Sequence, residues 1–386
     1  MADTAFDVII VGAGIAGVAA AAELSTTHRV VVLERESHPG YHSTGRSAAV
    51  FSETYGNAVI RALSRCSRRF LTEPPEDFTA TPLTKRREFL YIAREDQLAS
   101  LKAFAGAEDV SAATQLLSPA QARLFCPILR DGYVAAAVLE QDGADIDVHG
   151  LHQGYLRRLR DNGGVVLTDA EVHEIRRDAG IWSVRSAAGP ISAPILANAA
   201  GAWADRLAAL AAVPPIGLVP CRRTALLVAD PALTSIDHWP AVIDVDEHFY
   251  FKPDAGLLLL SPADETPTDP CDAQPEEIDV AVAIDRVQQA TTLDIRSVRR
   301  KWAGLRSFVA DRSPVIGYDD HVPGFFWIAG QGGYGIQTSP AAARLAASLI
   351  RGDRVPQELE ELGVSEASVS PKRLKTRETV HIDAED

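Results

Sequence analysis

The chain has 386 residues, of which 46% are hydrophobic and 23% charged, a globular composition whose length is typical of two domains. The 52 acidic residues outnumber the 38 basic ones, and the net charge of −14 argues against nucleic-acid or anionic-membrane partners, which need clustered positive charge. A small anionic substrate stays possible, because a few arginines can oppose the global sign. The four cysteines show no CxxC spacing, which favours inert thiols in a reducing compartment.

The N-terminal stretch 6–24 is nearly all apolar or small, as a signal peptide or membrane helix would be. No basic region precedes it and three glycines interrupt it, so we expect a cytoplasmic protein without a transmembrane segment. Residues 6–11 (FDVIIV) instead predict a buried strand, 15–25 an alanine-rich helix and 29–33 (RVVVL) a second buried strand. This strand–turn–helix–strand unit is typical of a parallel doubly wound sheet.

The patterns that follow predict a mixed α/β fold with a Rossmann-like dinucleotide domain and a substrate-binding domain that has an antiparallel or mixed sheet. Helices are predicted at 57–72, 95–104, 146–162, 277–290 and from 335 to about 350; strands are predicted at 88–93, 165–167, 171–176, 182–186, 195–200, 223–228, 249–252, 257–261 and 325–329, with those between 165 and 186 forming a small sheet. Composition changes predict discontinuous domains: 1–50, 145–214 and 300–360 form the first, 51–144 and 215–299 the second. The polar stretch 365–386 is expected to be a flexible tail.

A glycine motif between the first strand and helix, GAGIAG at 12–17, carries the main functional signal. Gly12 permits a tight turn, Gly14 lets the backbone approach a pyrophosphate, and Gly17 lets helix and strand pack closely. The helix N-terminus then offers free N–H groups to the phosphates. Glu34 ends the second strand. A carboxylate at this position accepts hydrogen bonds from ribose hydroxyls and repels a 2′-phosphate, so FAD or NAD is favoured over NADP.

The segment after Glu34, RESHPGYHSTGRSAA at 35–49, favours FAD. It is small and rich in hydroxyl groups, has little to pack as core, and is suited to lining an extended cofactor. An NAD enzyme would more often proceed directly to another βα unit. An NAD-dependent dehydrogenase therefore stays an alternative, which flavin absorbance in the purified protein would exclude.

Several segments, VGAGIAG, VVVLER, PGYHSTGRSAA, NAAGAW, WAGLRSF and AGQGGYGIQTSP, resemble the D-amino acid oxidase/dehydrogenase family of flavoproteins over nearly the whole chain. DEHFYFKPDAG, DGADID and LHQGYLR are similar to bacterial D-arginine dehydrogenases. The resemblance implies non-covalent FAD, no metal, and oxidation of a D-amino acid by hydride transfer from Cα to the flavin. The imino acid would hydrolyse to a 2-oxo acid and ammonia, and an unidentified acceptor would take the electrons.

The glycines at 332–335 precede a predicted helix, whose N-terminus is suited to stabilising negative charge on the reduced flavin. Together with the resemblance, this predicts a cofactor site made of residues from all parts of the first domain. Its members are Gly12, Ala13, Gly14, Ile15, Ala16, Gly17, Glu34, Arg35, His42, Ser43, Thr44, Gly45, Ser47, Ala48, Val172, Ala199, Gly201, Trp203, Gly304, Gly332, Gly333, Tyr334, Gly335, Ile336 and Gln337.

A substrate carboxylate needs a fixed cation, and a guanidinium fits because it makes two parallel hydrogen bonds. The resemblance assigns this role to Arg306 and Arg223; Arg222 competes with Arg223 for it, and should point to the opposite face of a strand. It also places Tyr55 and Tyr250 at the substrate, where packing aromatics are the alternative interpretation. The catalytic set is completed by Ser52 and Gly333, beside the flavin, and by Glu88.

Glu88 matches a glutamate that, in D-arginine dehydrogenases, meets the cationic end of the substrate, which implies a preference for D-arginine and D-lysine. The alternative is an ion pair with the basic run at 85–87. Val50 stands where the resemblance predicts a histidine, so a titratable group near the substrate amine is lost. Other substrates therefore stay open: a secondary amine, a 2-hydroxy acid, or a neutral or modified D-amino acid. A non-catalytic electron-transfer module is disfavoured, because it needs no carboxylate clamp.

Overall fold

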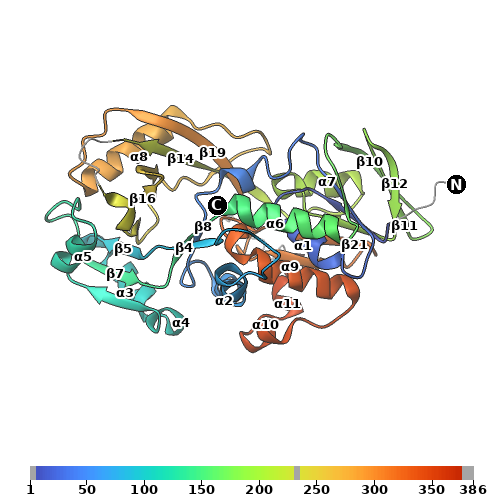
Figure 1. Cartoon of the computed structure of the whole chain (residues 1–386), viewed down its shortest axis with the longest axis horizontal. Helices are drawn as coiled ribbons and strands as arrows, with labels where there is room; N and C mark the ends of the chain where they lie inside the picture. The colour runs from blue at the N-terminus through green and yellow to red at the C-terminus, as the bar shows by residue number, and fades with distance from the viewer. Residues whose placement is uncertain (1–5, 230–234, 376–386) are drawn as a thin grey trace, which may run out of the picture.

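Two large β-sheets organise the chain, a six-stranded sheet toward the right of Figure 1 and a nine-stranded sheet toward the left. The structure is a computed structural model that describes residues 6–229 and 235–375. A three-stranded sheet extends the right-hand end, and another of three short strands lies between the large sheets. The predicted mixed α/β class is confirmed.

The six-stranded sheet has the order β20-β21-β13-β1-β2-β9, and all neighbours are parallel except β20 and β21. Its central strands are continuous apolar runs because helices and loops cover both faces. The prediction that 165–167 joins the small sheet is wrong, because β9 pairs with β2. The strands are β1 (Val8–Val11), β2 (Val30–Leu33), β9 (Val165–Leu167), β13 (Ile195–Asn198), β20 (Val315–Tyr318) and β21 (Phe325–Ala329).

Alternate side chains of this sheet enter two different cores. One core lies under α1 (Ile15–Leu24), whose alanines allow close packing against α6 (Val148–Asp161) and α9 (Gly335–Arg351). α2 (Ala58–Thr72) packs on the outer side of α9. The other core lies under α7 (Ala204–Leu210) and the small sheet, β10 (Val172–Asp178), β11 (Ile181–Ser186) and β12 (Gly189–Ala193). The predicted strand–helix–strand unit is confirmed, because α1 connects the parallel neighbours β1 and β2.

The nine-stranded sheet has the order β18-β14-β17-β16-β15-β5-β7-β6, and β19 pairs with β14. It is antiparallel except for the parallel pair β15 and β5, so a mixed sheet is correct. Because β19 belongs here, residues 298–308 are part of this sheet rather than of the six-stranded one; the domain division otherwise stays a prediction. The strands are β5 (Phe89–Ala93), β6 (Thr114–Leu117), β7 (Ala136–Glu140), β14 (Val219–Val228), β15 (Ala241–Asp244), β16 (Tyr250–Asp254), β17 (Leu257–Ser261), β18 (Thr266–Pro267) and β19 (Val298–Phe308).

Smaller elements complete the described chain. The short sheet is β3 (Val50–Phe51), β8 (Ala144–Ile146) and β4 (Thr84–Arg86); the helices are α3 (Leu98–Gly106), α4 (Glu108–Ser111), α5 (Pro119–Phe125), α8 (Glu277–Ala290), α10 (Gln357–Glu361), α11 (Glu366–Val369) and α12 (Lys372–Lys375), and the 3-10 turns are η1 (Ser43–Arg46), η2 (Glu95–Gln97), η3 (Gly201–Trp203) and η4 (Ile236–His238). No helix of residues 6–229 and 235–375 is long and apolar enough to cross a bilayer.

The chain segment 365–386, expected to be a flexible tail, is folded as far as it is described. Two short helices occupy 366–375, and the Arg373 guanidinium donates to Asp311 (Nε–Oδ2 2.8 Å). The expectation is therefore wrong for 365–375, because an ion pair holds this stretch against the fold. Residues 376–386 lie outside the described residues.

Candidate active site

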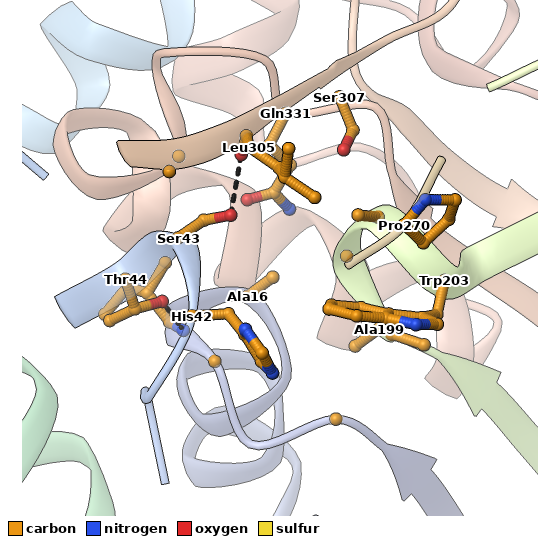
Figure 2. A pocket seen from close by; sticks show the side chains of 18 of the residues that line it. Ala16, His42, Ser43, Thr44, Ala199, Trp203, Pro270, Leu305, Ser307 and Gln331 are labelled. Carbon is orange, nitrogen blue, oxygen red and sulfur yellow. Dashed lines mark hydrogen bonds between the residues drawn. The ribbon is translucent and has the colours of Figure 1, made fainter. Parts of the chain in front are cut away.

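A cavity of about 600 Å³ begins at the glycine turn after β1 and continues to β19 of the larger sheet. Figure 2 shows Trp203 and Pro270 on one side of it, and His42, Ser43 and Thr44 on the other. The cavity is thus lined by segments that lie far apart in the sequence. An extended ligand that spans the two sheets would fit its length and composition.

The glycine turn has the geometry that the motif predicts. Gly12 has a φ of +108°, and a Cβ there would lie 2.3 Å from the carbonyl oxygen of Ala199. A Cβ on Gly17 would lie 1.9 Å from the carbonyl oxygen of Gly12. A Cβ on Gly14 would lie 3.3 Å from Thr44 Oγ1, where a small shift would suffice. Close packing therefore requires glycine at 12 and 17, and position 14 is less strict.

Glu34 is held in place by one backbone amide of the glycine turn and one of its own segment. Its Oε2 accepts from the N–H of Ala13 (2.8 Å) and its Oε1 from the N–H of Glu36 (3.0 Å). The carboxylate is buried yet lines the cavity. Because each carboxylate oxygen can accept a second hydrogen bond, Glu34 can also bind the ribose hydroxyls of a dinucleotide.

The hydroxyl-rich segment after β2 links the start of α1 to β19. Thr44 Oγ1 accepts from the N–H of Ile15 (3.0 Å), and Ser43 Oγ donates to the carbonyl oxygen of Leu305 (2.6 Å, Figure 2). The rings of His42 and Trp203 lie 4.6 Å apart, centroid to centroid. This segment therefore forms one wall of the cavity, as the sequence predicts.

Most of the predicted cofactor residues line this cavity. Those that do are Gly12, Gly14, Ile15, Ala16, Glu34, Arg35, His42, Ser43, Thr44, Ser47, Ala48, Val172, Ala199, Gly201, Trp203, Gly304, Gly332, Gly333, Gly335 and Ile336. Ala13, Gly17, Gly45 and Tyr334 lie outside its lining and support it from behind, and Gln337 lines a neighbouring cavity. Their contacts with a cofactor stay predictions.

A second, smaller cavity of about 80 Å³ adjoins the first. The two share the residues of one wall: Ser47, Ala48, Arg223, Tyr250, Arg306, Gly333 and Ile336. Tyr55, predicted to contact the substrate, and Ser52, predicted to lie beside the flavin, line the second cavity. A small molecule bound there would therefore adjoin the inner end of the larger cavity.

Arg306 stands at the wall that the two cavities share. Its Nη1 donates to the phenol oxygen of Tyr55 (3.2 Å), and it forms no ion pair with a carboxylate of the described chain. A Cβ on Gly333 would lie 2.7 Å from the guanidinium carbon, so glycine at 333 makes room for this arginine. Burial raises the pKa of Tyr55, which keeps its hydroxyl neutral. Arg306 can thus donate to an anion in either cavity.

Arg223 supplies a second guanidinium to the same wall. Its Nη2 donates to Glu265 (2.9 Å), and its buried Nε has no partner. Arg222 points to the other side of β14, where it pairs with Asp279 at 3.2 Å. The alternation expected for a strand is therefore confirmed. A buried donor without a partner is costly, so an anion bound close to this guanidinium would offset part of that cost.

The structure does not bring Glu88 to the site. Phe89 and Tyr91, which alternate on the same face of β5, line the second cavity, whereas Glu88 lines neither cavity. The Glu88 carboxylate lies 3.5 Å from Arg86, which is the ion pair considered as the alternative. The prediction that Glu88 faces the substrate side chain is wrong, because alternation along the strand turns it away.

Two charged residues of the second cavity were not predicted. Glu247 Oε2 accepts from the hydroxyl of Tyr55 (3.4 Å), and Lys252 Nζ lies 2.7 Å from Asp145. Lys252 follows the predicted Tyr250 by two positions on β16, so strand periodicity was a signal that could have found it. Glu247 lies in a loop, where no periodicity applies. No group of His, Cys, Asp or Glu in the described chain is arranged to hold a metal ion.

The fold and the cofactor cavity together define a dinucleotide-dependent protein with an adjoining small-molecule site. Residues 7–349 match the DAO family of FAD dependent oxidoreductases. The chain belongs to this family and is an FAD-dependent oxidoreductase, as predicted; FAD is its cofactor, and the NAD alternative is excluded.

Curated relatives cover nearly the whole chain at low identity. Sarcosine oxidase subunit beta of Rhodobacter capsulatus is 23% identical over 89% of this chain and 84% of its own length. Glycine oxidase of Geobacillus kaustophilus is 23% identical over 89% of this chain and 93% of its own. FAD-dependent oxidoreductase domain-containing protein 1 of Bos taurus is 25% identical, over 89% and 81%. The predicted likeness to D-arginine dehydrogenases is not tested by these relatives and stays a prediction.

Solved structures share the fold. L-proline dehydrogenase from P. horikoshii superposes with a TM-score of 0.82 at 20% identity, covering 96% of this chain and 98% of its own. The Geobacillus kaustophilus glycine oxidase gives a TM-score of 0.78 at 22% identity, covering 90% and 95%. At these identities the likeness shows the architecture alone. The substrate must therefore be argued from the side chains of the second cavity.

Proposed function

We propose that this protein oxidises an amino acid at the carbon that bears its amine, with the substrate carboxylate held between Arg306 and Arg223. The observation that carries the proposal is the pair of guanidinium groups on the wall shared by the two cavities, one without a carboxylate partner and the other with a buried, unpaired Nε. A carboxylate bound there satisfies both groups. A flavin electron-transfer module would need neither.

The residues around this wall orient the substrate. The guanidinium of Arg306 fixes the carboxylate in plane, and the neutral hydroxyl of Tyr55, which accepts from Arg306 and donates to Glu247, holds that guanidinium in place. Tyr250 closes the side of the second cavity that also faces the first. When bound, FAD supplies the acceptor for the hydride that leaves the substrate α-carbon. The imino acid product would hydrolyse in water to a 2-oxo acid and ammonia.

The walls of the second cavity favour a small neutral substrate. Apart from the guanidinium side, the lining is largely apolar, with Val50, Phe89, Ala241, Ile243 and Phe249. Glu88, from which the preference for a basic substrate side chain was predicted, lines neither cavity. The printed names of the relatives refer to sarcosine, glycine and L-proline, which are small amino or secondary amino acids. We therefore place a neutral amino acid, or an N-substituted one, first among the substrate classes.

A basic D-amino acid, D-arginine or D-lysine, is the second candidate. The Glu247 carboxylate lines the same cavity, and Tyr55 is its hydrogen-bond donor. It is thus able to meet a cationic side chain in place of Glu88. The preference inferred from the resemblance then rests on Glu247 alone, against the positive charge of Lys252 on the same lining.

Anaerobic bleaching of the flavin tests the proposal. The purified protein is mixed with glycine, sarcosine, both enantiomers of alanine, proline, arginine and lysine, and a 2-hydroxy acid. Bleaching by neutral amino acids supports the first class, and bleaching by D-arginine supports the second. A flavin that no amine reduces would overturn the proposal. Reoxidation with oxygen or with a dye then separates oxidase from dehydrogenase, and release of flavin on denaturation tests the predicted non-covalent binding.

A further inference from the structure

Glu140 is a buried carboxylate beside the second cavity that the function proposed above does not use. It ends β7 and is 1% exposed. Its Oε2 accepts from Ser52 Oγ (2.8 Å) and Thr54 Oγ1 (2.7 Å), and its Oε1 accepts from the N–H of Glu53 (3.0 Å). Within residues 6–229 and 235–375, no cation forms an ion pair with it. A buried charge without a cationic partner is expensive, so its presence needs a reason.

Ser52 connects this carboxylate to the cavity. Ser52 is one of the residues that line the cavity, whereas Thr54 and Glu140 are not. Gln337 fixes the backbone of Ser52 from both sides, because its Oε1 accepts from the Ser52 N–H (3.1 Å) and its Nε2 donates to the Ser52 carbonyl (3.3 Å). The Ser52 hydroxyl thus donates to a carboxylate behind the wall. Its oxygen accepts from the N–H of Thr54 (3.3 Å) and lies 3.4 Å from the hydroxyl oxygen of Tyr91, so one acceptor position remains for a substrate N–H when the Tyr91 hydroxyl donates to Thr54.

The charged and titratable neighbours leave Glu140 a better base than an ordinary glutamate. Burial raises the pKa of Glu140, the bonds from Thr54 and Ser52 oppose this, and the charge of Glu53 adds to it. From β5, Tyr91 faces the cluster; burial raises its pKa well above the ordinary value, so it stays neutral. From α2, Arg68 pairs with Glu53, not with Glu140.

We propose that Glu140 accepts the proton of the substrate ammonium group through the hydroxyl of Ser52. The ammonium N–H proton passes to Ser52 Oγ as the proton of Ser52 Oγ passes to Glu140 Oε2. The products are a neutral amine, an intact serine and a neutral carboxylic acid, so charge and protons balance. The neutral amine has the lone pair that assists departure of the hydride from the α-carbon. This inference rests on the proposed amine oxidation.

Val50 explains why this chain needs another proton acceptor near the substrate amine. It lines the second cavity, and its side chain cannot take a proton. Besides the two guanidinium groups, the charged side chains that line that cavity are Glu247 and Lys252; Lys252 pairs with Asp145, and Glu247 accepts from Tyr55. An amine on the other side of the α-carbon would instead adjoin Ser52. The Ser52–Glu140 pair then supplies the proton acceptor that Val50 lacks.

Three variants separate the relay from a structural role of the cluster. Ser52→Ala removes the link and leaves the carboxylate; Glu140→Gln removes the acceptor; Thr54→Val is the matched control, because Thr54 donates to the same Oε2 but does not line the cavity. Each is purified with FAD, its flavin content and melting temperature are measured, and the rate of anaerobic flavin reduction is followed from pH 6 to 10 with the best substrate of the panel.

We expect Ser52→Ala and Glu140→Gln to lower the second-order rate of flavin reduction at neutral pH by about 100-fold, and to recover it at high pH, where the free amine is already neutral. Thr54→Val should keep the maximal rate within about threefold. In the pH profile of this variant, the fall of the reduction rate on the acid side should move to higher pH. Loss of one hydrogen bond to the charged carboxylate raises the pKa of Glu140 further, so the carboxylate becomes protonated at a higher pH.

Equal losses in Ser52→Ala and Thr54→Val, without recovery at high pH, would show that the cluster only holds the loop and would overturn the relay. A folded, flavin-loaded Glu140→Gln variant with the wild-type pH profile would do the same. Failure of the proposed function looks different, because then no amine bleaches the wild-type flavin at any pH. Infrared difference spectra of the wild type against Glu140→Gln provide a readout without turnover: the carboxylic acid band of Glu140 should disappear as the pH rises.

Discussion

Replacement of Arg306 by lysine tests the arrangement on which the proposed function depends. The guanidinium makes a hydrogen bond to Tyr55 and has further N–H groups free for a carboxylate. A lysine ammonium reaches less far and cannot make two parallel hydrogen bonds to one carboxylate. The Arg306 guanidinium packs closely against Gly333, so the shorter lysine side chain would leave a gap between positions 306 and 333. The variant therefore keeps the positive charge but loses the two parallel hydrogen bonds that orient the carboxylate.

The expected loss is about 3 kcal/mol of transition-state stabilisation, equivalent to a fall in kcat/KM of more than about 100-fold. This corresponds to one bidentate, charge-assisted contact in a site closed from water. The assay is anaerobic flavin reduction over a range of substrate concentrations, which separates binding from the rate at saturation. We expect weaker substrate binding and a lower rate of flavin reduction at saturation, because the position of the carboxylate sets the distance between the α-carbon and the flavin.

Arg300→Lys is the matched control, since Arg300 lies on the same strand and is exposed. It should keep wild-type kinetics. Both variants should retain their flavin, because the glycine turn and Glu34, the predicted cofactor contacts, are left unchanged. Wild-type kinetics in a flavin-loaded Arg306→Lys protein would refute the carboxylate clamp.

Three further changes test neighbouring parts of the structure. Gly333→Ala places a Cβ 2.7 Å from the Arg306 guanidinium carbon, so steady-state kinetics should show kcat/KM about 10- to 100-fold lower with flavin retained. Gly17→Ala places a Cβ 1.9 Å from the Gly12 carbonyl oxygen, so denaturant titration should give an unfolding free energy about 1–3 kcal/mol lower, and the flavin absorbance should fall. Burial raises the pKa of Glu140 above 4.5, so the folded chain holds this proton more tightly than the unfolded one. The unfolding free energy of the wild type should therefore fall, relative to Glu140→Gln, as the pH rises from 4.5 through the folded-state pKa; a constant difference would contradict this.

The cofactor half of the site was predictable because its determinants are local. The turn after β1, the start of α1 and the acid at the end of β2 form one continuous segment, and each glycine answers a steric demand that can be stated from the motif. The wall formed by 42–48 follows directly in sequence. Its long-range bonds, such as that from Ser43 to the carbonyl of Leu305, required the fold.

The substrate half was harder, because its residues meet through strand pairing. EFLYIA at 88–93 is apolar at nearly every position, so the sequence contains no alternation from which to tell which face of the strand enters the cavity. A slip of one position exchanges Glu88 for Phe89 and turns a basic pocket into an apolar one. Glu140 was missed for a similar reason: its partner Ser52 lies 88 positions away, and the two meet because β3, which precedes Ser52, pairs with β8, which follows Glu140.

The spacing of the two arginines follows from the register of one strand pair. In β14 and β19, Arg223 lies opposite Gly304 and Cys221 lies opposite Arg306, so the two guanidinium groups are diagonal neighbours on one face. A shift of the register by one residue would move Arg306 to the other face, beside the guanidinium of Arg222. Gly304, which lines the cofactor cavity, brings no side chain into the space opposite Arg223. The proposed carboxylate clamp therefore depends on strand pairing, and a substitution that disturbs this register should abolish substrate binding while the protein retains its flavin.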